Sequence, residues 1–396
     1  MNYDRYINQR IASVPPSGIR RFFDLAASMK DTISLGVGEP DFKTPYAIRD
    51  AAINSLVDGE TQYTANRGLP ELREEIAFYL HSRYALRYDP ATEVLVTIGA
   101  SEAIDVALRA LISPGDEVLV PEPSYVSYSP GVIFAGGVPV GVETLEENNF
   151  RLQPKHLEAA ITPRTKALIL PYPNNPTGAI MERADLEAVA EVIRAHDLLV
   201  ISDEIYSELI YDGQTHISFA SLEGMAPRTL TINWFSKAFA MTGWRVGYAC
   251  GPAELISVMT KIHQYAIMCA PRQGQVAARE ALRMGRENGY EEVLRMRESY
   301  DRRRRLMVSS FRSMGLDCFE PYGAFYAFPS IRKTGMTSEE FCAALLKEKN
   351  VAAVPGTAFG PCGEGNIRCC YATAIDKLNI ALERMADFVG RHLQRS

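Results

Sequence analysis

Short apolar runs alternate with helical patterns between about residues 90 and 270, and this alternation most constrains the fold. The runs EVLVTI (93–98), ALILPYP (167–173) and LLVISDEIY (198–206) are almost continuously apolar, which is typical of strands covered on both faces. Between the last two, DLEAVAEVIRAHD (185–197) has the spacing of a crossover helix. We therefore predict an α/β fold with a mainly parallel central sheet flanked by helices. Further strand candidates are 116–125, 229–235 and 246–251.

The two flanks differ from this central region and predict a smaller second domain. Residues 1–45 are irregular and are expected to form an arm or lid, whereas residues 286–396 contain a long charged helix and fewer strands. We predict that residues 46–285 form the large domain and that both flanks build the small α/β domain. A length of 396 residues fits this division. The run Arg302–Arg305 is expected on a solvated helix face.

Composition excludes several other classes of protein. The net charge of −6 argues against general nucleic-acid binding. No apolar run reaches the roughly 18–20 residues of a membrane span, and the start MNYDRYINQR lacks the apolar core of a signal peptide. The seven cysteines are odd in number and irregularly spaced, which predicts buried thiols in a reducing cytoplasm rather than disulfides or a metal site.

Polar residues follow several predicted strands, at the sheet edge where ligands collect in parallel sheets. Gly99-Ala100-Ser101 opens a helix whose free N–H groups suit a phosphate, although Ser101 as a plain N-cap explains the pattern equally well. Asp203 ends an apolar strand, with Tyr206 three residues later. A buried carboxylate needs a partner, which is either structural or a protonated pyridine nitrogen. The turn Asn174–Gly178 is explained by its turn residues alone.

Two cations stand in the largely apolar stretch NWFSKAFAMTGWRVGY (233–248). A lysine that is desolvated there has a lowered pKa and becomes a nucleophilic amine, so Lys237 is a candidate for imine formation. Arg245 would supply a planar fork for phosphate oxygens. Each residue alone has a structural explanation. Together with the strand-end residues they predict a phosphate cradle, a ring-nitrogen partner, a phenol and an imine-forming lysine at one sheet edge.

These residues form a recognisable set of motifs. The chain resembles the fold-type I pyridoxal 5′-phosphate (PLP) aminotransferases of class I/II, in their aspartate/aromatic branch. The combination of SKAFAMTGWR with NNPTG and DEIY is the most specific part of this resemblance, which extends over nearly the whole chain. The matching segments are SLGVGEPDF (34–42), YTANRGLPELREEI (63–76), TIGASEAID (97–105), YPNNPTG (172–178), SDEIY (202–206), SKAFAMTGWRVGY (236–248), GAFYAFP (323–329) and IRCCYA (367–372).

The resemblance implies roles around the ring of PLP. Lys237 would form the Schiff base with the cofactor and then move the substrate proton. Asp203 would keep the pyridine nitrogen protonated, so that the ring acts as an electron sink. Asn175 and Tyr206 would hydrogen-bond the ring oxygen O3′, and Tyr125 would stack on the ring.

The resemblance also implies how the phosphate and the substrate are held. The phosphate would be bound by a helix start and by residues near the lysine: Ala100, Ser101, Ser236 and Arg245. Arg368 would grip the substrate α-carboxylate, with the Gly38 backbone in the segment that closes over it. Tyr63 would reach the phosphate of the partner subunit, which implies a homodimer with shared active sites.

The implied reaction is ping-pong transamination between an L-amino acid and a 2-oxo acid, with 2-oxoglutarate as the expected common acceptor. The donor stays open between aromatic, aspartate, alanine or other aliphatic, and acyl-diaminopimelate substrates. HQYAIMCAPRQG carries no arginine where one dicarboxylate-specific group has it, and Arg20 and Arg272 are unplaced alternatives. The alternative function is a β-lyase on the same fold, similar to cystathionine β-lyase. A ligand-sensing regulator would need an added DNA-binding region, and a nicotinamide dehydrogenase would need a G-x-G-x-x-G after a strand.

Two positions depart from the family pattern. Trp234 stands where NGFSK has a small residue, and Cys369-Cys370 replace the more usual Leu-Ser after the arginine. Both lie beside functional positions. The shape of the pocket is therefore less constrained by the resemblance than cofactor binding is.

Overall fold

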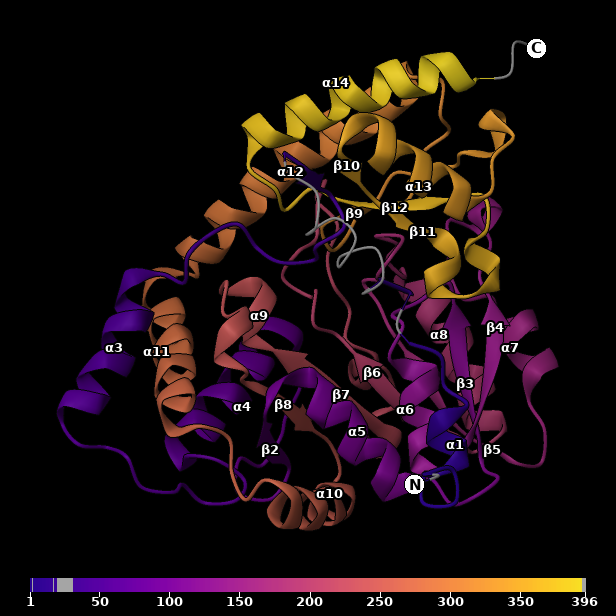
Figure 1. Ribbon diagram of the computed structural model, residues 1–396. Helices are drawn as coiled ribbons and strands as arrows, with labels where there is room; N and C mark the ends of the chain where they lie inside the picture. Colours follow the sequence, from indigo (N-terminus) through magenta and orange to yellow (C-terminus); the bar gives the residue numbers. More distant parts are fainter. Residues whose placement is uncertain (2, 17, 20–30, 394–396) are drawn as a thin grey trace.

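The computed structural model describes residues 1, 3–16, 18, 19 and 31–393. At its centre is a seven-stranded sheet with the strand order β2-β8-β7-β6-β5-β3-β4 (Figure 1). Strand β8 runs antiparallel to both of its neighbours and the remaining pairs are parallel, so the predicted mainly parallel sheet is confirmed. The strands are β2 (Val94–Thr97), β3 (Glu117–Glu122), β4 (Val138–Glu143), β5 (Thr165–Leu170), β6 (Leu199–Asp203), β7 (Thr229–Trp234) and β8 (Gly247–Cys250).

Helices cover both faces of this sheet because successive strand residues point to opposite sides. In β3, Val118 and Val120 contact the core under one helical layer, whereas Leu119 belongs to the core under the other. The first layer consists of α5 (Gly99–Leu111), α6 (Tyr128–Ala135) and α10 (Ala253–Ala266). The opposite layer consists of α3 (Tyr46–Val57), α4 (Pro70–Tyr84), α7 (Pro154–Ala160), α8 (Arg183–Ala195) and α11 (Arg272–Asn288).

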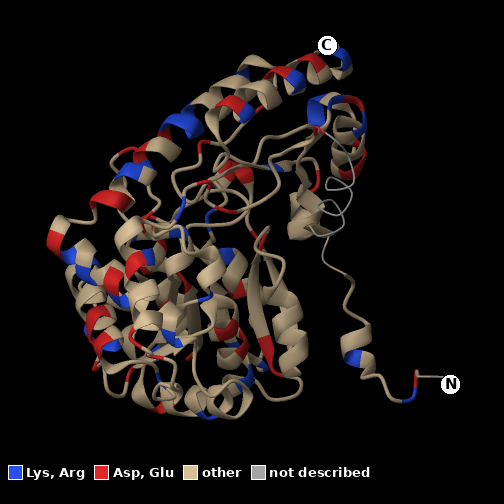
Figure 2. Cartoon of the chain, turned by 60° about the vertical axis from the view of Figure 1, so that its left-hand side comes forward, with Lys and Arg blue, Asp and Glu red and all other residues tan. Residues whose placement is uncertain are grey.

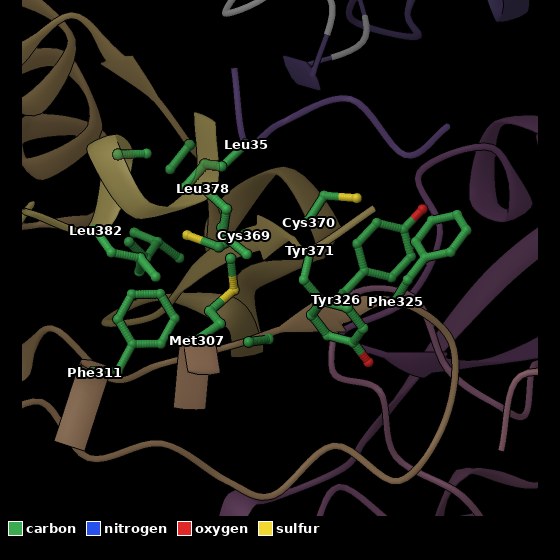
Figure 3. Close-up of a cluster of buried hydrophobic side chains, with 14 of the residues drawn as sticks. Leu35, Met307, Phe311, Phe325, Tyr326, Cys369, Cys370, Tyr371, Leu378 and Leu382 are labelled. Atoms are coloured by element: carbon green, nitrogen blue, oxygen red, sulfur yellow. The ribbon is translucent and has the colours of Figure 1, made fainter. Parts of the chain in front are cut away.

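The C-terminal part has its own core, which Figure 3 shows around Phe311, Cys369 and Leu382. It includes the long helix α12 (Glu291–Ser313), with α13 (Ser338–Lys349) and α14 (Ile375–His392). Its strands are β9 (Tyr326–Ala327), β10 (Val351–Ala352), β11 (Val354–Pro355) and β12 (Ile367–Cys370). The early strand β1 (Ile33–Ser34) pairs with β10, which ties the N-terminal segment to this part of the chain. The domain boundaries at residues 45 and 285 stay predictions.

Two short α-helices remain among the described α-helices. Helix α1 (Gln9–Ala12) contacts α6, and α9 (Phe235–Ala238) follows β7 directly. None of the described helices combines the length and the apolar character that a membrane span needs.

The arginine run in α12 does not lie wholly on a solvated face, so this expectation was wrong. Arg304 is 1% exposed and its guanidinium contacts Asp301, Asp212 and Glu320, while Arg303 donates to Asp41 over 2.8 Å. These carboxylates offset the cost of burying the two guanidinium groups. Acidic and basic residues are interspersed along the outer helices (Figure 2).

Candidate active site

A cavity of about 960 Å³ opens where the parallel strands end. It is lined by the start of α5, the end of β6, the turn into α9, the segment before residue 40, and β12. The fold thus brings together residues as far apart in the sequence as Gly38 and Arg368, because all of these elements meet at one sheet edge. The predicted residues that line the cavity are Gly38, Ala100, Ser101, Tyr125, Asn175, Asp203, Tyr206, Lys237 and Arg368.

Lys237 is buried in α9, one turn after the end of β7. Its Nζ donates to the carbonyl oxygen of Gly38 over 2.7 Å and lies 5.4–6.0 Å from the ring centroids of Tyr206, Trp234 and Phe325. No carboxylate pairs with this amine among the described residues. Burial lowers the pKa of Lys237 to about 8. A share of the amine is therefore neutral and nucleophilic near neutral pH.

Asp203 ends β6 with its carboxylate buried in the cavity wall. The Tyr128 hydroxyl donates to Oδ2 over 2.7 Å, and the Ile205 backbone N–H donates to Oδ1. Burial nevertheless raises the pKa of Asp203 to about 6. Within the described chain no cation pairs with this carboxylate, so the site fits a protonated ring nitrogen of a ligand.

Arg368 on β12 is also buried without a carboxylate partner in the part of the chain that is described. Its Nη1 donates to Asn175 Oδ1 over 2.9 Å and its Nη2 to the Gly36 carbonyl over 2.5 Å. The guanidinium lies over the ring of Tyr326, at 4.5 Å from the centroid, and Nε has no hydrogen-bond partner. Tyr326 in turn shares a hydrogen bond with the hydroxyl of Tyr206. The guanidinium is planar and its present acceptors are neutral oxygens, which a carboxylate can replace. Arg368 therefore fits a carboxylate ligand.

The start of α5 provides the place for an anion. Gly99 has φ of 70°, and the next two residues, Ala100 and Ser101, line the cavity in the first turn of α5, where backbone N–H groups have no partner within the helix. Arg245 Nη2 lies 3.0 Å from the position where a Cβ on Gly99 would stand. Arg245 borders the neighbouring shallow pocket rather than the main cavity. Ser236 is fully buried, and its hydroxyl donates a hydrogen bond to the Met241 carbonyl.

The other predicted residues that the structure describes lie outside this cavity. Tyr63 is 78% exposed and is not part of the cavity wall of its own chain. Arg272 forms an ion pair with Glu60 at 2.9 Å, which accounts for it structurally, and Arg20 lies outside the described residues. Of the described residues that line the cavity, only Lys237 and Arg368 are cations.

Two site residues were not singled out from the sequence. Tyr128 bonds to Asp203, and Tyr326 bonds to Tyr206 and lies under Arg368. Tyr128 lies three residues after Tyr125 in PEPSYVSY, so the repeated tyrosine was an available signal. Tyr326 lies within GAFYAFP, a segment that matches the family but to which no role was assigned.

The donor set agrees with pyridoxal phosphate. An amine with a lowered pKa suits the aldehyde carbon, a buried acid without a cation suits the pyridine nitrogen, and a helix start suits the phosphate. With the parallel sheet and these strand-end positions, this chemistry defines a PLP-dependent enzyme of fold type I.

Comparison with known proteins gives the family. The model of "Aminotransferase class I and II" matches residues 30–385, and the chain belongs to this family. An aspartate aminotransferase of Pyrococcus abyssi is 49% identical, and an aromatic-amino-acid aminotransferase of Thermococcus litoralis is 45% identical, each over 96% of this chain and 97% of the relative. The solved structure of Thermus thermophilus aspartate aminotransferase with maleate superimposes with a TM-score of 0.92 at 40% identity, covering 96% of this chain and 99% of that chain.

The protein is thus a PLP-dependent aminotransferase that exchanges an amino group between an L-amino acid and a 2-oxo acid. The predicted family, fold class, reaction and cofactor are confirmed. None of these findings favours the alternative of a β-lyase.

Proposed function

We propose that the amino donor carries an uncharged apolar or aromatic side chain, and that the enzyme works as a cytoplasmic homodimer. The observation that carries the donor assignment is the lining of the cavity beyond the cofactor residues. That part of the wall consists mainly of apolar side chains, among them Val14, Ile19, Ile104 and Phe134. Such a wall stabilises an apolar side chain by removing it from water.

The charges of the cavity agree with an uncharged donor side chain. With Arg368 assigned to the α-carboxylate and Lys237 to the cofactor, the described wall offers no further cation for a distal carboxylate. Asp105 also lines this region and forms an ion pair with Arg109 at 2.9 Å. A second carboxylate on the donor would find no unpaired cation in this described part of the wall, since Arg109 is already paired with Asp105. Because some relatives are named aspartate aminotransferases, aspartate is the donor against which apolar donors should be compared.

The site residues then have separate roles in the reaction. Bound PLP supplies an electron sink for the charge that develops at the substrate α-carbon. Lys237 would take the proton from that carbon and pass it to the aldehyde carbon of the cofactor, and would move a proton in the opposite direction during the second half of the reaction, a role worth about 10²–10⁴ in rate. Asp203 would hold the proton at the ring nitrogen, and Tyr206 and Asn175 would contact the ring oxygen. Arg368 exchanges its contacts with Asn175 and the Gly36 carbonyl for the substrate carboxylate.

The remaining assignments concern stacking, phosphate and substrate closure. Tyr125 would stack on the ring, while Gly38 carries the carbonyl that holds Lys237 and lies in the segment above the substrate. The phosphate would be held by Ala100, Ser101, Ser236 and Arg245, together with Tyr63 of the second copy.

An exposed apolar surface supports the homodimer. Tyr63, Tyr265 and Met268 are 78%, 89% and 43% exposed, and the Asn66 side chain donates to the Met268 carbonyl over 2.9 Å, so these segments lie side by side. Exposed aromatic and methionine side chains are enriched where proteins associate. Seven free cysteines agree with a reducing compartment such as the cytoplasm.

The donor assignment is tested with a panel of amino acids against 2-oxoglutarate and pyruvate, measured as kcat/KM. We expect phenylalanine, tyrosine or leucine to exceed aspartate by at least about 10-fold, since a distal carboxylate would be desolvated without a cation. In an Asp105→Asn variant the disadvantage of aspartate should shrink. Aspartate as the best donor would contradict the proposal, and ammonia release without any acceptor would point to the β-lyase.

A further inference from the structure

Trp234, at the end of β7, contacts both cations of the stretch 233–248. The Arg245 guanidinium carbon lies 4.8 Å above the centroid of its ring, and Lys237 Nζ lies 5.6 Å from it. The ring atom Cζ3 is 3.5 Å from the place where a Cβ on Gly99 would stand. Trp234 also lines the main cavity. The indole thus extends from the start of α5 to the lysine, between the cavity and Arg245.

Few other polar contacts hold Arg245 in place within the described chain. Its Nη1 donates to the Thr242 carbonyl over 3.2 Å, and no carboxylate lies within ion-pair distance of it in the part of the chain that the structure describes. A long arginine side chain loses considerable rotamer freedom when it is fixed. The face of an indole is the best aromatic partner for a guanidinium and offsets part of this loss.

We propose that Trp234 is a positioning residue for the cofactor phosphate. Its indole holds the Arg245 guanidinium by a cation–π contact, with Nη2 beside Gly99, where the N–H groups of α5 begin. This contact raises the affinity of the protein for PLP through Arg245. The inference rests on the assignment of Arg245 to the phosphate. The opposing explanation is that the indole only fills space between β7 and α5.

The test compares two substitutions by titrating the cofactor-free protein with PLP. Trp234→Leu fills space without an aromatic face, and Trp234→Phe keeps a ring. We expect Trp234→Leu to weaken PLP binding by about 3- to 30-fold and Trp234→Phe by less than about 3-fold. Native affinity in Trp234→Leu, or an equal loss in both variants, would overturn the proposal.

A double-mutant cycle separates this inference from the phosphate assignment. If Trp234 acts through Arg245, Trp234→Leu should cause no further loss of PLP affinity in an Arg245→Ala background. Additive losses would overturn the inference and leave the phosphate assignment intact. If Arg245→Ala alone binds PLP with native affinity, the phosphate assignment fails and the inference fails with it.

A second readout leaves Trp234 unchanged and therefore does not depend on the folding of its variants. Trp234 and Trp244 are the two tryptophans of the chain, and Trp244 lies outside the main cavity with its indole N–H on Thr44 Oγ1. In a cofactor-free Trp244→Phe protein, inorganic phosphate should change the fluorescence of Trp234, and Arg245→Ala should abolish this change. Unchanged emission at phosphate concentrations that compete with PLP would contradict the proposal.

Discussion

Three charged side chains in the site are buried without an opposite charge in the described chain. Lys237 and Arg368 donate to backbone carbonyls, and Asp203 accepts from a tyrosine hydroxyl. Each arrangement keeps the group hydrogen-bonded and leaves its charge uncompensated. A ligand with a pyridine nitrogen, an electrophilic carbon and a carboxylate would satisfy all three groups at once. The ligand-free protein therefore bears a stability cost that binding relieves.

This cost predicts a pH dependence of stability. Burial lowers the pKa of Lys237 from 10.5 to about 8, so between these pH values the unfolded chain binds more protons than the folded one and stability rises with pH. Below pH 8 the buried ammonium costs at most about 3 kcal/mol. Cofactor-free Lys237→Met should therefore be more stable than native protein at pH 7, and the gain should disappear between pH 8 and 10.5.

Urea unfolding of the cofactor-free proteins at several pH values measures this effect. The control is Lys261→Met, because Lys261 is exposed and its replacement should change the free energy of unfolding little. A pH-independent gain in Lys237→Met would show that hydrophobic replacement, rather than the buried charge, is responsible.

The Tyr128 hydroxyl controls the ionisation of Asp203. Its hydrogen bond lowers the pKa of Asp203 against the opposing effect of burial, which leaves that pKa at about 6. In Tyr128→Phe the pKa should rise further, since the ionised carboxylate loses a donor. We expect PLP affinity to fall by about 10-fold at pH 6 and to recover at higher pH. Titrations across pH 5–8 measure the shift, and an unchanged pH profile would contradict it.

At the scale of elements, the segment before residue 40 covers the ends of the strands. The carbonyl of Gly36 accepts from Arg368 and that of Gly38 accepts from Lys237, so one short segment contacts both cations. A Cβ on Gly38 would stand 2.1 Å from the Tyr326 hydroxyl oxygen. The backbone can approach Tyr326 this closely only because residue 38 is glycine.

Gly38→Ala should therefore displace this segment and lower kcat/KM by about 10-fold or more, because small displacements of positioning groups are costly. Adding Tyr326→Phe should restore part of the loss, since the next ring atoms are 3.0 and 3.2 Å away. Tyr326→Phe alone is the control, because it also removes the hydrogen bond to Tyr206. The same loss in the single and the double variant would contradict this account.

The sequence predicted the elements whose residues lie in a uniformly buried environment. The central strands were recognisable because both of their faces are buried, and the polar residues at their ends included Ser101, Asp203 and Lys237 of the cavity wall. Strand β4 was missed because VPVGVE lies at the sheet edge with mostly exposed or half-buried residues. The antiparallel direction of β8 could not be predicted, since a run of apolar residues does not indicate whether its strand is parallel or antiparallel to its neighbours.

Contacts between distant residues could not be predicted from local patterns. Arg304 is buried by Asp212 and Glu320, which lie 92 and 16 positions away, and Tyr128 meets Asp203 across 75 positions. The positions of the catalytic residue types followed from strand ends and motifs. The hydrogen bonds that tune them arise only when the chain is folded.

At the scale of the whole molecule, the proposed dimer places Tyr63 in the partner's site. Tyr63→Phe should weaken PLP binding by about 10-fold, as expected for one hydrogen bond to a charged group, and should leave the molecular mass in sedimentation that of a dimer. Hybrid dimers of Tyr63→Phe and Lys237→Ala chains should regain one site of native affinity. Native PLP affinity in the Tyr63→Phe homodimer would contradict the shared site.

The central claim is that Lys237 is the amine that binds the cofactor and moves the substrate proton. The most direct measurement is the visible spectrum of the PLP-loaded protein during single turnover with an amino donor. Native protein should be yellow, and its band should shift when the donor is added and return when a 2-oxo acid follows. Lys237→Ala should lose the native band and turn over at least about 10²–10⁴-fold more slowly. A Lys237→Ala protein that converts amino acid to 2-oxo acid at the native rate would contradict the account.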